Sequence, residues 1–365
     1  MAKIIPVCKG NNELYRIYIE DSFLNLNLVL NDFELKNRKV CIVTDSNVSK
    51  LYESTVRDSI EKITSQVTTF VMNAGEENKN LDTVENLYQH LIDHHFDRKD
   101  LLLALGGGVV GDLCGYCAAT YLRGIDFVQI PTTLLAQTDS SIGGKTGVDF
   151  QNYKNMVGAF HMPKLVYMNL SVLKSLDERQ FASGMAEVLK HGLIKNSAYY
   201  EWLIDHFNEI NDREYEILEE MIYQSCLVKK AVVEKDPTEQ GERALLNFGH
   251  TIGHAIEKYM DFKYTHGECV ALGCIAAANI SYQRKMLSTE EFYEIRDMFV
   301  PFSLPISITD VDSKEIIALT KSDKKMEGNY VKFILLKKVG KAVIDTTVTD
   351  EEMIQAVNEL NIRWE

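Results

Sequence analysis

A glycine-rich segment at residues 101–112 (LLLALGGGVVGD) is the first part of the sequence with an identifiable chemical use. Gly106, Gly108 and Gly111 match the pattern G-x-G-x-x-G, between an apolar run typical of a strand and a pattern typical of a helix. Glycines let the backbone approach a pyrophosphate, and the N-terminus of the following helix favours the negative charge. The segment therefore predicts a dinucleotide site, with a plain strand-to-helix turn as the alternative.

The acid that binds the ribose of such a nucleotide has two candidates. Asp126 lies 20 residues after Gly106, where a ribose-binding acid would follow this pattern. Asp45 ends an earlier apolar run, and the carboxyl ends of parallel strands are where such sheets bind their ligands. The spacing alone does not choose between these two acids.

A polar segment follows at residues 129–155 (QIPTTLLAQTDSSIGGKTGVDFQNYKN). It is rich in hydroxyls, amides, glycines and lysines and has few apolar residues after Leu135. A purely structural loop does not need the cluster of Asp139, Lys145, Lys154 and Asn155. We expect a loop that binds a polar ligand, with a solvated surface loop as the alternative.

A set of histidines indicates metal chemistry. His250 and His254 are four residues apart, which places them on one face of a helix. His266 begins another predicted helix, and Glu187 and His191 share a third helical stretch. Two histidines and one carboxylate, with an open position for water or substrate, form a catalytic zinc site. The spacing leaves all five residues as candidate ligands, and a structural histidine pair as the alternative.

The elements that must position these residues change character along the chain. Five apolar runs alternate with helical patterns, as in a parallel sheet covered on both faces: residues 39–44, 67–72, 101–105, 127–130 and 165–168. Helical stretches then dominate: residues 178–195, 198–207, 214–235, 245–259, 268–284 and 289–298. Residues 330–344 predict a strand pair that turns near Val339 and Gly340. We therefore expect an α/β protein, with a Rossmann-like, parallel-sheet dinucleotide-binding domain at residues 1–176 and a mainly α-helical metal- and substrate-binding domain at residues 177–365.

The composition excludes several classes of protein. The chain has 365 residues, 45% of them hydrophobic and 25% charged, as in ordinary globular proteins. Its net charge of −14 disfavours binding to nucleic acid or to an anionic membrane, and no apolar run reaches the roughly 18 residues of a membrane span. Seven scattered cysteines and the lack of an apolar signal region lead us to expect a cytoplasmic protein. Cys114 and Cys117 are expected to be small apolar residues one helical turn apart.

Cationic side chains nonetheless gather near the polar motifs of this acidic chain. They are Arg123, Lys145, Lys154, Lys190, Lys195, Lys229, Lys230, Arg243 and Lys324. Several of them are ordinary exposed cations, but local positive charge in an acidic protein suits a small substrate with more than one anionic group.

Taken together, these segments resemble the 3-dehydroquinate synthase family of sugar-phosphate cyclases. The resemblance runs from about residue 44 to residue 325 and depends on nine motifs in the same order: TDSNV (44–48), GEENK (75–79), LGGGVVGDLCGYCAATYLRGI (105–125), QIPTTLLAQTDSSIGGKTGVD (129–149), KNMVGAFHMPK (154–164), SGMAEVLKHGLI (183–194), LNFGHTIGHAIE (246–257), THGECVALG (265–273) and DKK (323–325).

The resemblance implies the cofactors and the residues that hold them. NAD would be held by Asp45, Glu76, Lys79, Gly107, Gly108, Val109, Asp112, Thr132, Thr133, Asp139, Lys145 and Lys154, which favours Asp45 over Asp126. A divalent metal, zinc or alternatively cobalt, would be held by Glu187, His250 and His266, with His254 beside it. The substrate would contact Arg123, Lys145, Lys154, Asn155, Lys190, Lys229, Arg243, Asn247, His254 and Lys324. The expected catalytic residues among these are Lys145, Asn155, Lys190, Arg243, Asn247 and His254. Arg123 would reach the site of a neighbouring subunit in a homodimer.

The reaction that the resemblance implies is a phosphate-eliminating lyase reaction of the shikimate pathway, which leads to chorismate and the aromatic amino acids. It converts 3-deoxy-D-arabino-heptulosonate 7-phosphate (DAHP) to 3-dehydroquinate and phosphate. NAD would oxidise the hydroxyl at C5, phosphate would leave, the ketone would be reduced again, and an intramolecular aldol step would close the ring. The alternatives are another sugar-phosphate cyclase, such as 2-deoxy-scyllo-inosose synthase, and a metal-dependent polyol dehydrogenase, such as glycerol dehydrogenase.

Overall fold

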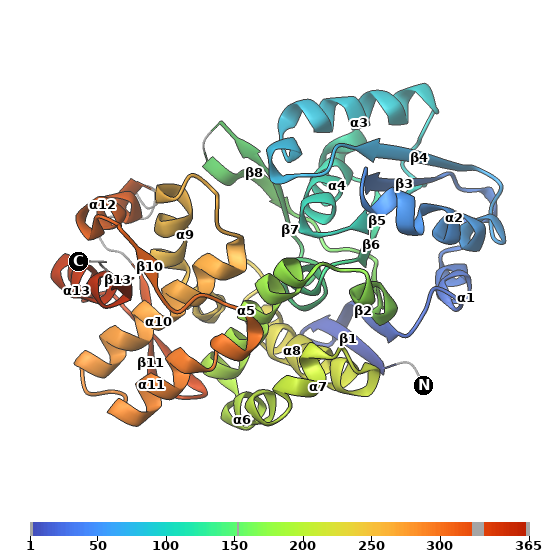
Figure 1. Ribbon diagram of the computed structural model, residues 1–365. Coiled ribbons are helices and arrows are strands. Elements are labelled where there is room, and N and C mark those ends of the chain that lie inside the picture. The colour runs from blue at the N-terminus through green and yellow to red at the C-terminus, as the bar shows by residue number, and fades with distance from the viewer. Residues whose placement is uncertain (1–2, 152, 323–331, 363–365) are drawn as a thin grey trace. The chain divides into compact units, whose positions relative to one another are not determined.

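The chain forms two compact units in the computed structural model, which describes residues 3–151, 153–322 and 332–362 (Figure 1). The first unit comprises Met1–Leu176 and Lys229–Glu234, and the second comprises Asp177–Val228 and Lys235–Glu365. Part of one long helix, α8 (Tyr215–Lys235), therefore belongs to the first unit.

A seven-stranded sheet forms the centre of the first unit, in the order β1-β2-β9-β6-β5-β3-β4 (Figure 1). Neighbouring strands run parallel except for β1 and β2. The strands are β1 (Lys3–Lys9), β2 (Asn12–Glu20), β3 (Val40–Asp45), β4 (Val67–Met72), β5 (Leu101–Gly106), β6 (Asp126–Pro131) and β9 (Leu165–Asn169). The five apolar runs predicted as strands all lie in this sheet, which confirms the predicted parallel α/β architecture.

Both faces of the sheet are buried. Along β5, Leu101, Leu103 and Leu105 join one hydrophobic cluster, while Leu102 and Ala104 join another, because successive side chains of a strand point to opposite faces. Residues of α1 (Leu26–Leu30) and α2 (Ser54–Glu61) complete the first cluster. Residues of α3 (Leu81–Asp93) and α4 (Gly108–Thr120) complete the second. Burial on both faces explains why these strands are continuous apolar runs.

Cys114 and Cys117 lie on α4, where both thiols are buried in the second cluster. Burial raises the pKa of each thiol well above its ordinary value. The prediction that they are small apolar residues one helical turn apart is therefore confirmed.

Two hairpins of the first unit differ from the sequence prediction. β1 and β2 form an antiparallel pair that was not predicted. β7 (Lys145–Phe150) and β8 (Tyr153–Phe160) form a second antiparallel pair, of which β7 and the first three residues of β8 lie in the segment predicted as a loop. The loop prediction is wrong there because such a hairpin needs few apolar residues: along β7, only Thr146, Gly147 and Val148 are buried.

Helices make up most of the second unit. They are α5 (Glu178–Lys195), α6 (Ser197–Asp205), α7 (Phe207–Asn211), most of α8, α9 (His250–Tyr259), α10 (His266–Gln283), α11 (Thr289–Asp297), α12 (Ser313–Ser322) and α13 (Asp350–Leu360). Two short strand pairs accompany them: β10 (Ile308–Thr309) with β13 (Asn361–Ile362), and β11 (Phe333–Lys338) with β12 (Lys341–Asp345). The second pair confirms the predicted turn at residues 339–340. No helix within the described ranges has the length and apolarity that crossing a membrane requires.

The helix predicted at residues 245–259 is broken. Glu242–Asn247 forms a 3-10 turn, and α9 begins only at His250. Gly249 separates the two with a φ of +81°. This left-handed conformation interrupts a helix, and glycine adopts it at little cost.

Candidate active site

Side chains from three helices of the second unit form the best candidate metal site. Glu187 lies in the middle of α5 and is completely buried, while His250 and His266 are the first residues of α9 and α10. The Nε2 atoms of His250 and His266 lie 3.5 Å and 3.4 Å from Glu187 Oε1. One ligand atom from each residue lies within 4.8 Å of those of the other two.

These separations fit a tetrahedral divalent metal. Bonds of about 2.0–2.2 Å place neighbouring ligand atoms of a tetrahedron about 3.3–3.6 Å apart. Within the described part of the chain, neither buried carboxylate oxygen of Glu187 accepts a hydrogen bond of ordinary geometry. The close partners of this buried carboxylate are the Lys190 ammonium and the two histidine rings, and a divalent cation among the three ligand atoms would take the place of the histidine contacts. The two histidines and the carboxylate leave a fourth position for substrate, as catalytic zinc sites do.

The protonation states of two of the three residues favour metal binding. Burial alone would raise the pKa of Glu187, but the ammonium of Lys190 on the same helix lowers it well below the ordinary value, so the carboxylate is ionised. Burial holds the pKa of His250 well below its ordinary value. The ring of His250 is therefore neutral at neutral pH and can offer a nitrogen lone pair to a metal. For His266, burial would lower the pKa, but the carboxylate of Glu187 outweighs it and raises the pKa above the ordinary value, so a metal must displace that proton.

Glycines allow these three helices to approach closely. Gly267 N on α10 donates a hydrogen bond of 3.0 Å to Ser183 Oγ on α5, and a side chain at Gly267 would overlap the main chain of Ser183. A Cβ atom at Gly253 on α9 would lie 2.7 Å from Cys269 O on α10, where real Cβ contacts stay beyond 3.0 Å. Gly273 on α10 packs against α9 in the same way. This packing brings together the helix ends that carry the two histidines.

Two of the predicted substrate residues lie next to the metal trio. His254 is one turn along α9 from His250, and their ring centroids are 5.1 Å apart. Lys190 is 1% exposed and forms an ion pair with Glu187. A candidate proton carrier and a fixed cation therefore flank the proposed metal ligands.

The 3-10 turn before α9 carries Arg243 and Asn247, also predicted from the sequence. Asp236, which the sequence analysis overlooked, accepts a hydrogen bond of 3.1 Å from Arg243 N, and Arg243 Nη1 donates to Pro237 O at 2.6 Å. Glu239, which the sequence analysis also overlooked, accepts a hydrogen bond of 2.8 Å from Asn247 Nδ2. The turn-forming sequence DPTEQG at residues 236–241 could have identified both residues, because it predicts a turn just before Arg243.

The glycine turn of the first unit lies at the carboxyl edge of the sheet. Gly107 is the N-cap of α4, and Gly108 is its first residue. A Cβ atom at Gly107 would lie 3.0 Å from Thr133, and one at Gly108 would lie 3.0 Å from Ser140. The exposed N–H groups of a helix N-terminus next to so close a turn suit a phosphate.

The structure also separates the two candidate ribose acids. Asp45 ends β3, which pairs in parallel with the strand before the glycine turn, so it lies at the same edge of the sheet. Asp126 begins β6 and therefore lies at the opposite edge, where its Oδ2 atom is 3.2 Å from Arg38. Of the two, only Asp45 is at the edge where a nucleotide would bind.

Lys79 is the centre of a buried polar network in the first unit. Its Nζ lies 2.7 Å from Asp112 Oδ2 on α4 and 3.9 Å from Glu76 Oε1, and donates 2.6 Å to Asn155 Oδ1 on β8. Burial would lower the pKa of Lys79, but the carboxylates of Asp112 and Glu76 outweigh it and raise the pKa above its ordinary value. The network thus keeps the ammonium of Lys79 charged, although the residue is only 4% exposed.

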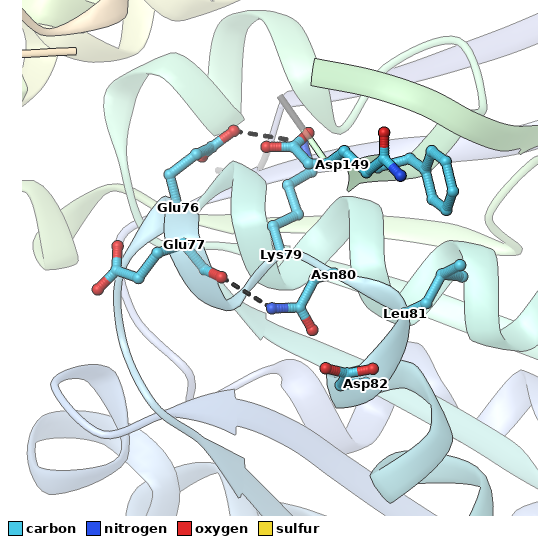
Figure 2. Close-up of a pocket in the computed structure, with 9 residues that line it drawn as sticks. Glu76, Glu77, Lys79, Asn80, Leu81, Asp82 and Asp149 are labelled. Carbon is cyan, nitrogen blue, oxygen red and sulfur yellow. Dashed lines mark hydrogen bonds and ion pairs between the residues drawn. The ribbon is translucent and has the colours of Figure 1, made fainter. Parts of the chain in front are cut away.

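A pocket of about 410 Å³ lies beside this network (Figure 2). It is lined by Glu76, Glu77, Lys79, Asn80, Leu81, Asp82, Asp149, Phe150 and Gln151. Figure 2 shows Glu76, Lys79 and Asp149 close together on one side of it.

Other predicted residues of the first unit lie on neighbouring elements. Lys229 forms an ion pair with Asp139, and Lys154 Nζ lies 4.0 Å from Glu76 Oε1. Thr132 N donates 2.9 Å to Gly106 O, directly after β6.

The remaining predicted residues are placed as follows. Val109 is in the first turn of α4, and Lys145 is the first residue of β7. Arg123 is exposed and has a φ of +68°. Lys324, with the rest of the DKK motif, lies outside the described residues.

Comparison with protein families gives two adjoining matches. A model described as 3-dehydroquinate synthase N-terminal matches residues 69–183, and one described as 3-dehydroquinate synthase C-terminal matches residues 184–326. A 3-dehydroquinate synthase of Acetivibrio thermocellus is 42% identical over 343 residues, which cover 94% of this chain and 95% of that protein.

Solved structures of related enzymes share the fold over almost the whole chain. A 2-deoxy-scyllo-inosose synthase complexed with carbaglucose-6-phosphate, NAD+ and Co2+ has a TM-score of 0.88 at 26% identity, covering 98% of this chain and 100% of that one. The 2-epi-5-epi-valiolone synthase of Streptomyces hygroscopicus, with NAD+ and Zn2+ bound, has a TM-score of 0.88 at 25% identity, covering 95% and 96%.

Proposed function

Since this chain belongs to the 3-dehydroquinate synthase family, we infer that it converts DAHP to 3-dehydroquinate and phosphate. The chain is thus a phosphate-eliminating carbon–oxygen lyase of the shikimate pathway. The single observation in its own site that supports this reaction is the convergence of Glu187, His250 and His266 at metal-ligand spacing. A metal held at such a site would assist oxidation of a substrate hydroxyl, because it stabilises the developing alkoxide.

The proposed reaction uses NAD and a divalent metal. When bound, NAD supplies a hydride acceptor that is restored in each cycle, and the metal supplies a Lewis acid. We propose zinc as the metal, with Glu187, His250 and His266 as its ligands. For NAD we propose Asp45, Glu76, Lys79, Gly107, Gly108, Val109, Asp112, Thr132, Thr133, Asp139, Lys145 and Lys154. Two similar structures that carry NAD+ with Co2+ or Zn2+ support NAD and a divalent metal as the cofactors.

The chain's own polar side chains would bind and orient the substrate. A buried guanidinium such as that of Arg243 is held by its turn, so it binds an anionic group with little loss of side-chain freedom. His254 would hold or move a proton at a ring nitrogen beside the metal ligands. The full proposed set is Arg123, Lys145, Lys154, Asn155, Lys190, Lys229, Arg243, Asn247, His254 and Lys324.

The identity of the substrate separates this proposal from its nearest alternative. A 2-deoxy-scyllo-inosose synthase acts on a sugar phosphate, whereas DAHP also carries a carboxylate, for which we propose Lys229 with Arg243. The 42% identity to a 3-dehydroquinate synthase, against 26% to an inosose synthase, favours DAHP. A polyol dehydrogenase would instead accumulate NADH in proportion to the substrate consumed.

The test is phosphate release from DAHP by zinc-loaded protein with a catalytic amount of NAD, while nicotinamide absorbance is followed. Many phosphates per NAD with no lasting NADH, and 3-dehydroquinate as the product, are expected. Release of phosphate from glucose 6-phosphate but not from DAHP would identify another cyclase. NADH that rises with a polyol would identify a dehydrogenase.

We also propose that the enzyme is a cytoplasmic homodimer in which Arg123 reaches the site of the neighbouring subunit. The cysteines among the described residues are free, which suits a reducing compartment. Mixing two inactive variants, Arg123→Ala and His250→Ala, tests the shared site: mixed dimers should regain part of the activity, because each supplies one intact site.

A further inference from the structure

The β7–β8 hairpin is tied to the loop that carries Lys79 through a single acidic residue, Asp149. Its main-chain N–H donates a hydrogen bond of 2.8 Å to Lys79 O, which joins the hairpin to the loop. Its side-chain Oδ1 accepts a hydrogen bond of 2.8 Å from Asn155 N on the opposite strand. Asp149 therefore contacts two residues to which the proposed function gives separate roles, Lys79 for NAD and Asn155 for the substrate.

The main chain of Asn155 turns sharply near the start of β8. Its φ is +52°, in the left-handed region that asparagine adopts more readily than most residues other than glycine. The β7–β8 pairing is also irregular between Val148 and Phe150, directly beside Asp149. An acceptor fixed at the main-chain N–H of Asn155 stabilises this conformation and sets the direction of its side chain.

The side chain of Asn155 points back to the network around Lys79. Its Oδ1 accepts a hydrogen bond of 2.6 Å from Lys79 Nζ. The same Nζ lies 2.7 Å from Asp112 Oδ2. Asp149, Asn155 and Lys79 thus form a closed loop of contacts: main chain to main chain, side chain to main chain, and side chain to side chain. A shift at any one of them moves the other two.

We propose that Asp149 is a positioning residue that holds Asn155 and Lys79 in register. The side-chain amide of Asn155, which would bind the substrate, and the ammonium of Lys79, which would bind NAD, then keep a fixed separation. This rests on the proposed function, which assigns the roles of Asn155 and Lys79. Asp149 itself contacts neither ligand in this proposal; it acts through the hairpin.

The essential property of Asp149 is an acceptor at its Oδ1 position. Burial raises the pKa of Asp149, the N–H of Asn155 lowers it, and the nearby carboxylate of Glu76 raises it again, so the net pKa lies above the ordinary value. The surroundings therefore do not favour the charged form of this side chain, and the contact to Asn155 N needs only an acceptor oxygen. An amide oxygen can accept the same hydrogen bond, whereas a methyl group cannot.

Three variants test this: Asp149→Ala, which removes the acceptor, Asp149→Asn, which keeps it, and Asp82→Ala as the matched control. Asp82 lines the same pocket and is exposed. For Asp149→Ala we expect the Kd for NAD, measured by titration without substrate, and the KM for DAHP to rise together by about three- to tenfold, the equivalent of one hydrogen bond. For Asp149→Asn, the Kd for NAD and the KM for DAHP should stay within about twofold of the wild-type values. The same is expected for Asp82→Ala, which removes a carboxylate from the same pocket.

The proposal is overturned if Asp149→Ala keeps wild-type values of both constants, or if it only lowers the melting temperature. It is also overturned if Asp149→Asn is as damaged as Asp149→Ala, since charge and not the acceptor would then be the requirement. Failure of the proposed function is distinguishable, because wild-type protein would then release no phosphate from DAHP. The NAD titration still tests the contact to Lys79 in that case.

Discussion

Replacing Gly273 by alanine tests whether close packing of α9 on α10 builds the metal site. A Cβ atom at this position would overlap Gly249 O and would lie 2.8 Å from Gly253 N. Real Cβ contacts stay beyond 3.0 Å, and the obstacles are main-chain atoms that cannot rotate away. The two helices must therefore separate by about 1 Å to accept the methyl group.

Two effects of opposite sign decide the stability of Gly273→Ala. Alanine is a better helix former than glycine by about 1 kcal/mol. Overpacking a rigid core costs about 1–3 kcal/mol, and contact with main-chain atoms of both Gly249 and Gly253 places this site at the upper end. The net loss is about 2 kcal/mol, or about 4–8 °C in melting temperature for a unit of this size.

Metal affinity should fall more clearly than stability. His250 and His266 are the first residues of the two separating helices, whereas metal–ligand distances tolerate changes of only about 0.2 Å. We expect the Kd for zinc to rise at least about tenfold.

The assay is thermal unfolding with and without zinc, together with zinc competition against a chelating dye. The control is Ala276→Gly on the same helix, a buried position where the change removes a methyl group. It should lower the melting temperature but leave zinc affinity unchanged. Wild-type melting temperature and wild-type zinc affinity for Gly273→Ala would refute the packing argument.

The other predictions concern single groups. His250→Ala removes a metal ligand, so the Kd for zinc should rise at least about a hundredfold, and bound zinc and turnover should fall together. Full zinc content with normal turnover would reject the assignment. Asp112→Asn removes the closest carboxylate from buried Lys79, so a titration should show a Kd for NAD about tenfold higher, and an unchanged Kd would count against the network. Arg284→Ala breaks two hydrogen bonds to Glu352, of 2.6 Å and 2.7 Å, and should cost about 1–2 kcal/mol at neutral pH. Because the hydrogen bond to Arg284 lowers the pKa of Glu352 from 4.5, this stabilisation is present above about pH 4.5 and is lost as the pH falls through the lower folded-state pKa. In urea titrations the difference between Arg284→Ala and the wild type should therefore shrink in acid to the part supplied by the hydrogen bonds to Thr347, and a difference that stays constant with pH would contradict the linkage.

The strands of the first unit were predictable because parallel strands buried on both faces must be continuous apolar runs. The antiparallel hairpin β1–β2 was missed although its signal is present: Gly10, with a φ of +60°, stands between the two strands. The β7–β8 hairpin gave a weaker signal, since only Thr146, Gly147 and Val148 of the two strands are buried and its exposed side chains mix polar residues with apolar ones such as Phe150 and Met156. Apolar patterning identifies strands by burial and says little about strands that are exposed.

From spacing alone, the sequence offered five candidate metal ligands of suitable residue type but did not show which three of them meet. Spacing left His191 and His254 as alternatives, because the three ligands come from helices that meet through long-range contacts. The glycine contacts that bring these helices together depend on which helix faces which, a property of the fold and not of local sequence. The roles of Asp149 and Asp236 lie in hydrogen bonds to main-chain groups, which no side-chain pattern records.

The segment Lys229–Glu234 has a consequence for how the protein is made. It completes the first unit through the ion pair of Lys229 with Asp139 and through Glu234 Oε1, which accepts a 2.7 Å hydrogen bond from Cys8 N, 226 residues earlier. A nascent chain therefore cannot finish its N-terminal unit when Leu176 leaves the ribosome. It must wait for about 58 further residues, roughly 3–12 s at usual elongation rates. During that interval the nucleotide-binding half is an unfinished intermediate, so a gene truncated after codon 176 would encode a protein that lacks its last structural piece.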